Sequence, residues 1–167
     1  MNPNPTPATD LPDGAAGPAR EVLAFRLGEE EYAVDILRVQ EIRAYERPTR
    51  LAHAPDYVRG VINLRGAIVP IVDLRLKLGV GGPDCDAFTV VIVLNVGRRI
   101  VGAVVDAVSD VIALAPAQLR ELPVLDGHAA GPHLQAVGAV DDRLLILLDA
   151  DRLMTDDPLG AAGTTLQ

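Results

Sequence analysis

The side chains that could carry catalytic chemistry in this sequence are few and isolated. Ser109 is the only serine and Cys85 the only cysteine. Ser109 lies beside Asp110 in an apolar segment without the G-x-S-x-G pattern of a nucleophile elbow, which favours a turn or cap hydroxyl. Cys85 lies in a linker-like stretch with no adjacent base to activate its thiol. A hydrolase is therefore the least favoured interpretation, and we predict that the chain is not an enzyme.

Metal and phosphate chemistry are also weakly indicated. His128 and His133 share a loop with Asp126, but there is no cysteine or second acidic cluster to complete a ligand set. The glycine-rich segments VGVGGPD and GHAAGP lack the Lys and Ser or Thr of a phosphate-binding loop. We therefore predict no catalytic residue, no metal site and no cofactor, which favours a recognition protein.

Charge and composition limit the class of partner. The formal net charge is −8, the pI is about 4.7 and aromatic residues make up 3% of the chain. A phosphate-backbone footprint needs clustered Lys and Arg, and base stacking needs aromatic side chains. We predict no nucleic-acid partner, although a small β-barrel nucleic-acid-binding protein is kept as the alternative function.

Cysteine usage and hydropathy indicate the compartment. One cysteine in 167 residues cannot form an intramolecular disulfide, and a reducing compartment is then the default. No apolar run approaches the 18 residues that a membrane span needs. We predict a cytoplasmic protein with no direct membrane insertion.

The stretch from Arg59 to Gly79 is the element that must position the rest. It predicts two strands, Val61–Leu64 and Ile68–Val72, joined by a tight turn at Arg65-Gly66-Ala67, because β-branched residues flank a glycine. Asp73 can then cap a short helix, Leu74–Leu78, that Gly79 ends. A hairpin of this kind is marginal alone, so it predicts a larger β-structure around it.

Other segments follow the same pattern. Turn residues separate three further hairpins, with strands at Val22–Leu27 and Glu31–Ile36, Val90–Leu94 and Ile100–Val105, and Val137–Val140 and Leu144–Leu148. Asp35 begins an irregular or helical turn, Pro116 opens a short helix at Ala117–Glu121, and 122–134 is a long loop. Residues 1–20, rich in proline, predict a disordered tail, and 158–167 a flexible one.

The two halves of the chain repeat one layout. An offset of 69 places Glu21–Ile42 on Val90–Val111, and an offset of 76 places Val61–Asp73 on Val137–Asp149. Each half has the size of a small barrel. We predict an all-β fold of two five-stranded barrels side by side over residues 21–157, with the subdomains exchanging around 79–87.

A few residues have no catalytic use but suit a recognition surface. Glu41 and Arg65 carry opposite charges, and closure of the barrel would bring them within reach of each other. An exposed ion pair adds little to stability, so its value would lie in fixing surface geometry. The small or apolar residues Val39, Gly60, Gly102 and Val108 are explained equally well by core packing.

These residues carry a resemblance to CheW-type chemotaxis coupling proteins, which extends from about Glu21 to Met154. It rests on the segments EEYAVDILRVQEIR, VRGVINLRGAIVPIVDLRLKLG, TVVIVLNVGRRIVGAVVDAVSDV and DDRLLILLDADRL. The ordered string N-L-R-G-x-I-V-P-I-V-D-L-R is highly specific. The resemblance implies two SH3-like barrels, no enzymatic activity, and an adaptor that links the cytoplasmic tips of methyl-accepting chemotaxis receptors to the regulatory domain of the histidine kinase CheA.

The resemblance also implies the site. The groove between the barrels that contacts the receptor would include Val39, Gly60, Val90, Gly102 and Val108. Glu41 and Arg65 match the acid and arginine pair of the family, and their neighbours Ile42 and Gly66 are included in the receptor- and kinase-binding surface. The outer hairpins of the first barrel would dock the kinase.

Overall fold

β-Strands form most of the computed structural model of the protein, which describes residues 19–80, 85, 87–120 and 134–155. The strands are β1 (Arg20–Leu27), β2 (Glu30–Asp35), β3 (Val39–Ala44), β4 (Val58–Leu64), β5 (Ala67–Asp73), β6 (Val90–Val96), β7 (Arg99–Val105), β8 (Ala107–Leu114), β9 (Leu119–Arg120), β10 (Leu134–Val140) and β11 (Arg143–Leu148). Short helical elements connect them: η2 (Ile36–Arg38), α2 (Leu74–Leu78), η3 (Pro116–Gln118) and α3 (Ala150–Thr155).

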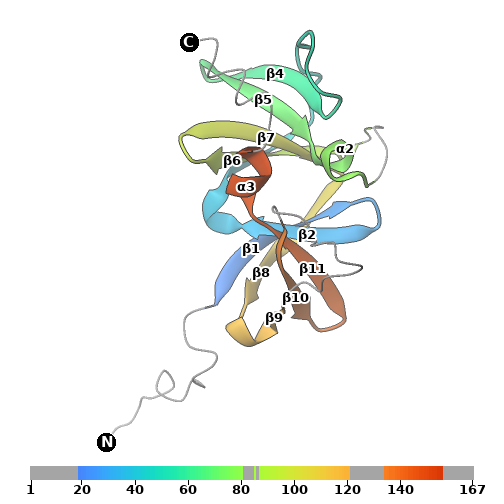
Figure 1. Cartoon of the computed structure of the whole chain (residues 1–167), viewed down its shortest axis with the longest axis vertical. Coiled ribbons are helices and arrows are strands. Elements are labelled where there is room, and N and C mark those ends of the chain that lie inside the picture. Colours follow the sequence, from blue (N-terminus) through green and yellow to red (C-terminus); the bar gives the residue numbers. More distant parts are fainter. Residues whose placement is uncertain (1–18, 81–84, 86, 121–133, 156–167) are drawn as a thin grey trace, which may run out of the picture.

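The strands form two mixed sheets that lie one against the other (Figure 1). Sheet A has the order β8-β1-β2-β11-β10-β9, and sheet B has the order β3-β6-β7-β5-β4. The predicted all-β fold with two side-by-side barrels is confirmed. Sheet A exceeds the predicted five strands only by β9, which is two residues long.

Neither sheet corresponds to one half of the sequence. The hairpin β1–β2 belongs to sheet A, but the next three strands belong to sheet B, where β3 pairs with β6. The second half divides in the same way, because β6 and β7 join sheet B and the strands from β8 onward join sheet A. Each barrel is therefore built from both repeats.

The repeat extends to the pairing register. β5 runs parallel to β7 with Ile71 opposite Gly102, and β11 runs parallel to β2 with Leu147 opposite Ala33. The offsets of 76 and 69 carry the first pair onto the second. The duplication predicted from the pattern is thus repeated in the strand pairing.

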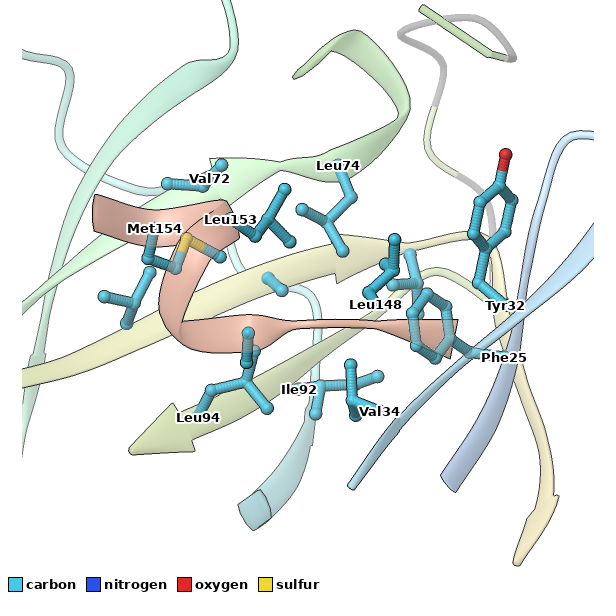
Figure 2. Close-up of a cluster of buried hydrophobic side chains, with 14 of the residues drawn as sticks. Phe25, Tyr32, Val34, Val72, Leu74, Ile92, Leu94, Leu148, Leu153 and Met154 are labelled. Atoms are coloured by element: carbon cyan, nitrogen blue, oxygen red, sulfur yellow. The ribbon is translucent and has the colours of Figure 1, made fainter. Parts of the chain in front are cut away.

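Three apolar clusters hold the fold together. One lies within sheet A and includes Ala33 and Leu147, and another lies within sheet B and includes Ile71 and Val104. The largest lies between the sheets, where Leu153 and Met154 of α3 pack with residues of both (Figure 2). Burying one such side chain contributes about 1.5–3 kcal/mol, so α3 is a substantial tie between the barrels.

The helical turn predicted to begin at Asp35 is present as η2, which Asp35 caps and which leads into β3. Two other local predictions need correction. The strand β4 begins at Val58, earlier than the predicted Val61. The helix predicted at Ala117–Glu121 is wrong: η3 ends at Gln118, whose side chain accepts from the Ala115 N–H at 2.7 Å, and the chain then extends as β9 to pair with β10. Pairing with a neighbouring strand here outweighs the local helical signal.

Several predictions concern segments outside the described residues. Most of the predicted tails, residues 1–18 and 156–167, lie there, as do most of the 79–87 exchange region and the 122–134 loop. Their conformation stays a prediction.

Candidate functional site

Arg65 and Glu41 meet where the two edges of sheet B come together. Arg65 lies at the tip of the β4–β5 hairpin, in a two-residue turn where Arg65 and Gly66 have φ of 51° and 91°. The Arg65 guanidinium donates a hydrogen bond to Glu41 of β3, at the opposite edge of the sheet. Curling of sheet B therefore brings together two residues that are 24 positions apart.

The geometry of this pair is fixed by its neighbours. The Gly66 N–H donates to Asn63 Oδ1 at 2.9 Å, which supports the tight turn. Positive φ at both central residues matches the right-handed strand twist and favours glycine at the second position. Arg43 donates to the other Glu41 oxygen at 3.3 Å. Hydrogen bonds from Arg65 and then Arg43 hold the pKa of Glu41 below its ordinary value, against partial burial.

Three of the predicted groove residues border the space between the barrels. Val39, Val90 and Val108 are half-buried and pack against the inter-sheet cluster. We call these three residues the valine rim. Ile42 is 45% exposed and lies opposite Ile92, which belongs to the inter-sheet cluster. The structure thus brings these residues to one apolar margin that includes both sheets.

The two remaining predicted residues are buried glycines with packing roles. A Cβ at Gly60 would lie 2.0 Å from the backbone oxygen of Thr49, and its φ of 141° is strained for other residues. A Cβ at Gly102 would lie 2.6 Å from Ile71 Cδ1 and 2.8 Å from Val91 Cγ1, inside the cluster of sheet B. Both glycines are thus explained by close packing of the fold itself.

A buried charge network joins the two barrels, and sequence reasoning missed it. Arg75 of α2 is 2% exposed; it donates to both oxygens of the fully buried Asp73, at 3.0 and 2.9 Å, and to Asp106 at 2.8 Å. Arg59 also donates to Asp73, at 2.9 and 2.7 Å. Asp106 in turn accepts from the Gly28 N–H of sheet A at 2.6 Å.

This network keeps the Asp73 carboxylate charged. Burial works to raise the pKa of Asp73, but the hydrogen bonds from Arg75 and Arg59 outweigh it and hold that pKa below its ordinary value. Hydrogen bonds to Asp73 and then to Asp106 raise the pKa of Arg75, against the effect of burial. The close spacing of Asp73 and Arg75 was the signal in the sequence, but we interpreted Asp73 only as a helix cap. That cap is present, because the Arg75 backbone N–H donates to Asp73 at 3.0 Å.

A second acid and arginine cluster lies in sheet A. Arg143 donates to both oxygens of Glu31, at 2.9 and 2.8 Å, and to both oxygens of Asp110, at 3.2 and 3.1 Å. Ser109 donates to Glu31 at 3.0 Å. The hydroxyl considered as a nucleophile is thus a hydrogen-bond donor in an ion-pair cluster.

The described part of the chain holds neither a candidate metal site nor a candidate membrane span. No group of three His, Cys, Asp or Glu side chains suited to a metal ion is found there, and His128, His133 and Asp126 lie outside it. No helix among the described residues is long and apolar enough to cross a membrane.

The fold and this surface define a β-barrel recognition module. CheW-like domains match residues 21–157, and the chain belongs to that family. The chemotaxis protein CheW of Klebsiella aerogenes is 50% identical over 140 residues, 84% of each chain. The probable chemotaxis protein CheW of Rhizobium etli is 38% identical over 143 residues, 86% of this chain and 92% of the relative.

A solved structure supports the same assignment. The scaffolding protein TtCheW from Thermoanaerobacter tengcongensis superposes with a TM-score of 0.74 at 28% identity, over 81% of this chain and 92% of that one. The resemblance predicted from the motifs is confirmed. These comparisons give no support to the alternative of a nucleic-acid-binding protein.

Proposed function

We propose that this protein is a non-enzymatic adaptor that couples chemoreceptor tips to the histidine kinase CheA in the cytoplasm. The observation that carries the proposal is its membership of the CheW-like family over residues 21–157. Relatives bear the name chemotaxis protein, and the structural neighbour is titled a scaffolding protein. Two barrels give such an adaptor two distinct surfaces.

The receptor surface in this proposal is the valine rim together with Ile42. An apolar margin between two packed units suits an amphipathic helix, whose apolar face fills such a groove. Ile42 contributes the largest exposed area, since the three valines are already half-buried. The buried glycines Gly60 and Gly102 pack against Thr49 and against the cluster of sheet B, and they are not part of this proposed surface.

The kinase surface in this proposal is the tip of the β4–β5 hairpin. Ile68 is 64% exposed and Arg65 is 63% exposed, so an apolar and a charged contact lie on one rigid hairpin. Glu41 holds the guanidinium in place from β3. Exposed charges of this kind contribute mainly to specificity and orientation of a complex.

Coupling follows from thermodynamics. An adaptor that contacts both partners changes the conformational equilibrium of the kinase only through its different affinities for the two kinase states. The network of Arg75 and Asp106 and the packing of α3 connect the two barrels. The adaptor therefore needs no chemistry of its own.

The test is a reconstitution with a receptor cytoplasmic fragment and the CheA regulatory domain, each titrated separately. Ile42→Asp should weaken receptor binding by about tenfold or more, since it puts an unpaired carboxylate into an apolar contact, while kinase binding persists. Val111→Asp is the matched control, because Val111 is the repeat equivalent of Ile42 on sheet A and is 53% exposed.

Three results would count against the proposal. Wild-type protein that binds neither fragment removes the adaptor function. Equal loss from Ile42→Asp and Val111→Asp removes the assigned receptor surface. Loss of both partners from Ile42→Asp, with a lowered melting temperature, makes Ile42 a folding residue.

A further inference from the structure

The loop between β3 and β4 borders an open cavity whose charged lining residues are mostly arginines. The cavity has a volume of about 630 Å³, and its charged and polar lining residues are Tyr45, Arg47, Arg50, Asp56, Arg59 and Cys85. An adjoining hollow of about 370 Å³ shares Arg50, Asp56 and Arg59. Among the described lining residues, three guanidiniums thus accompany one carboxylate, in a chain whose formal net charge is −8.

Two of these arginines are unpaired within the described structure. The side chains of Arg47 and Arg50 make no ion pair or hydrogen bond with any residue in the described ranges, and both are exposed. By contrast Arg59, on β4, is held by Asp73. The wall of the cavity therefore combines the guanidinium of Arg59, which Asp73 holds in place, with those of Arg47 and Arg50, whose N–H groups can donate to a ligand.

The backbone that carries the unpaired arginines is fixed. Thr49 lies between them and exchanges two hydrogen bonds with Val61 of β4, at 2.9 and 2.8 Å. The absence of a side chain at Gly60 lets the Thr49 carbonyl approach this closely. Pro48, in the same segment, is buried. Arg47 and Arg50 therefore project from a braced segment, which lowers the ordering cost of binding a ligand between them.

A neutral donor completes the lining. Burial raises the pKa of the Tyr45 phenol. The phenol is therefore protonated at neutral pH and can donate a hydrogen bond to an anion.

We propose that this cavity binds a small polyanion of phosphate type. Guanidiniums donate paired hydrogen bonds to phosphate oxygens, and such charge-assisted bonds are stronger than neutral ones. A volume of 630 Å³ lies in the range of ligand sites, but this cavity is predominantly polar, which favours a small, densely charged ligand. The proposal is independent of the adaptor function.

The binding test uses the full chain with inorganic phosphate, pyrophosphate and ATP, titrated by calorimetry at low ionic strength. We expect saturable binding of pyrophosphate with one site per chain. ATP that binds no tighter than pyrophosphate assigns recognition to the phosphates, whereas tighter binding assigns part of it to the nucleoside. Arg47→Ala and Arg50→Ala should each weaken binding by about tenfold, as expected for a lost charged hydrogen bond.

Cys85 provides a second readout, because it is the only cysteine of the chain and lines the cavity. Its rate of modification by a neutral maleimide should fall as pyrophosphate saturates the site. Asp56→Asn should tighten binding, since it removes a carboxylate that lines the cavity. A folding defect would weaken binding instead.

Arg98→Ala is the matched control, because Arg98 is exposed in the β6–β7 turn and its removal changes the net charge equally. The affinity of this variant for pyrophosphate should stay within about twofold of wild type, since Arg98 is not among the residues that line the cavity. Equal weakening by Arg98→Ala, binding without saturation, or an unchanged Cys85 rate would overturn the proposal. Tighter binding of a polyglutamate peptide than of pyrophosphate, dependent on Arg47 and Arg50, would also overturn it, in favour of an acidic protein segment.

Discussion

The same strand position carries an acidic residue in both barrels, but the arginine that pairs with it differs in exposure and in the number of its partners. The offset of 69 carries Glu41 of sheet B to Asp110 of sheet A. Glu41 pairs with Arg65 at the tip of a hairpin, whereas Asp110 pairs with Arg143 at the first residue of β11. The arginine of sheet A is 34% exposed and that of sheet B 63% exposed.

The difference lies in what the arginine contacts. Arg143 contacts two carboxylates, on β2 and β8, and so braces three strands. Arg65 contacts one carboxylate and leaves most of its surface to solvent. Four of the exposed apolar residues are matched in pairs under the repeat offsets, Ile42 with Val111 and Ile68 with Leu144. In the same layout, the arginine thus braces three strands of sheet A but remains mostly exposed on sheet B.

The largest expected effect on stability comes from comparing two repeat-equivalent buried positions, Gly102 in sheet B and Ala33 in sheet A. Gly102→Asp should destabilise the protein by at least about 3 kcal/mol, because it buries an unpaired carboxylate among Ile71 and Val91. Chemical denaturation measures it. The repeat equivalent, Ala33, already carries a Cβ, and Ala33→Gly should cost about 1 kcal/mol. A stably folded Gly102→Asp variant that loses only receptor binding would return Gly102 to the groove.

The next effect compares a buried with an exposed ion pair. Arg75→Leu should destabilise the protein by about 3 kcal/mol, since it leaves Asp73 and Asp106 short of a buried partner. Arg38→Ala, which removes the exposed pair with Asp151, should cost less than about 1 kcal/mol. Equal costs would show that burial does not distinguish the two pairs.

The pH dependence of this difference has a defined sign. The pKa of Asp73 is lowered in the folded state, so its contribution is present above the unfolded pKa of about 3.9 and is lost as pH falls through the folded value. The gap in unfolding free energy between wild type and Arg75→Leu should therefore narrow below about pH 4. A gap independent of pH would remove the charge explanation.

Charge reversals address the two acid and arginine clusters directly. Arg65→Glu and Glu41→Arg should each weaken kinase binding by about tenfold or more with little change in melting temperature. Arg143→Glu should instead lower the melting temperature and leave kinase binding of the folded fraction unchanged.

The double reversal of Glu41 and Arg65 sharpens this result. Because the two side chains are hydrogen-bonded, the double variant should recover part of the lost binding, and the cycle measures their coupling. Kinase and receptor binding at wild-type level in both single reversals would make Arg65 an ordinary solvated turn residue.

The smallest expected effects are in the titration of the two glutamates. Arg143 is the main cause that lowers the pKa of Glu31, ahead of Ser109, and Arg65 is the main cause for Glu41, ahead of Arg43. Carboxyl NMR should show a larger rise after Arg143→Ala than after Ser109→Ala, and after Arg65→Ala than after Arg43→Ala. The reverse order in either barrel would contradict the assigned contacts.

Local sequence signals predicted the hairpins because their determinants are local. Glycines at 28, 66 and 97 have positive φ in the structure, and Asp73 and Gly79 cap α2 as expected. The Glu41–Arg65 contact also followed, since a small barrel brings its edges together. Such features depend on turn geometry and on residues within one repeat.

An exchange between the repeats was predicted, but the strands that take part in it could not be predicted in this way. Whether β3 pairs with β2 or with β6 is decided by burial in the inter-sheet cluster, which involves residues far apart in the sequence. The burial of Arg75 has the same origin, because Asp106 reaches it only in the folded barrels. Alternation of apolar residues defines a face of a strand but not the partner that covers it.

Because each repeat is divided between the two barrels, one barrel is completed before the other during synthesis. Sheet B has all its strands once β7 ends at Val105, but sheet A requires β11, which ends at Leu148. The first strands to leave the ribosome thus belong to the barrel that is completed last. During synthesis the β1–β2 hairpin therefore lies beside a complete sheet B. Its apolar face remains only partly covered until β10 and β11 have been synthesised.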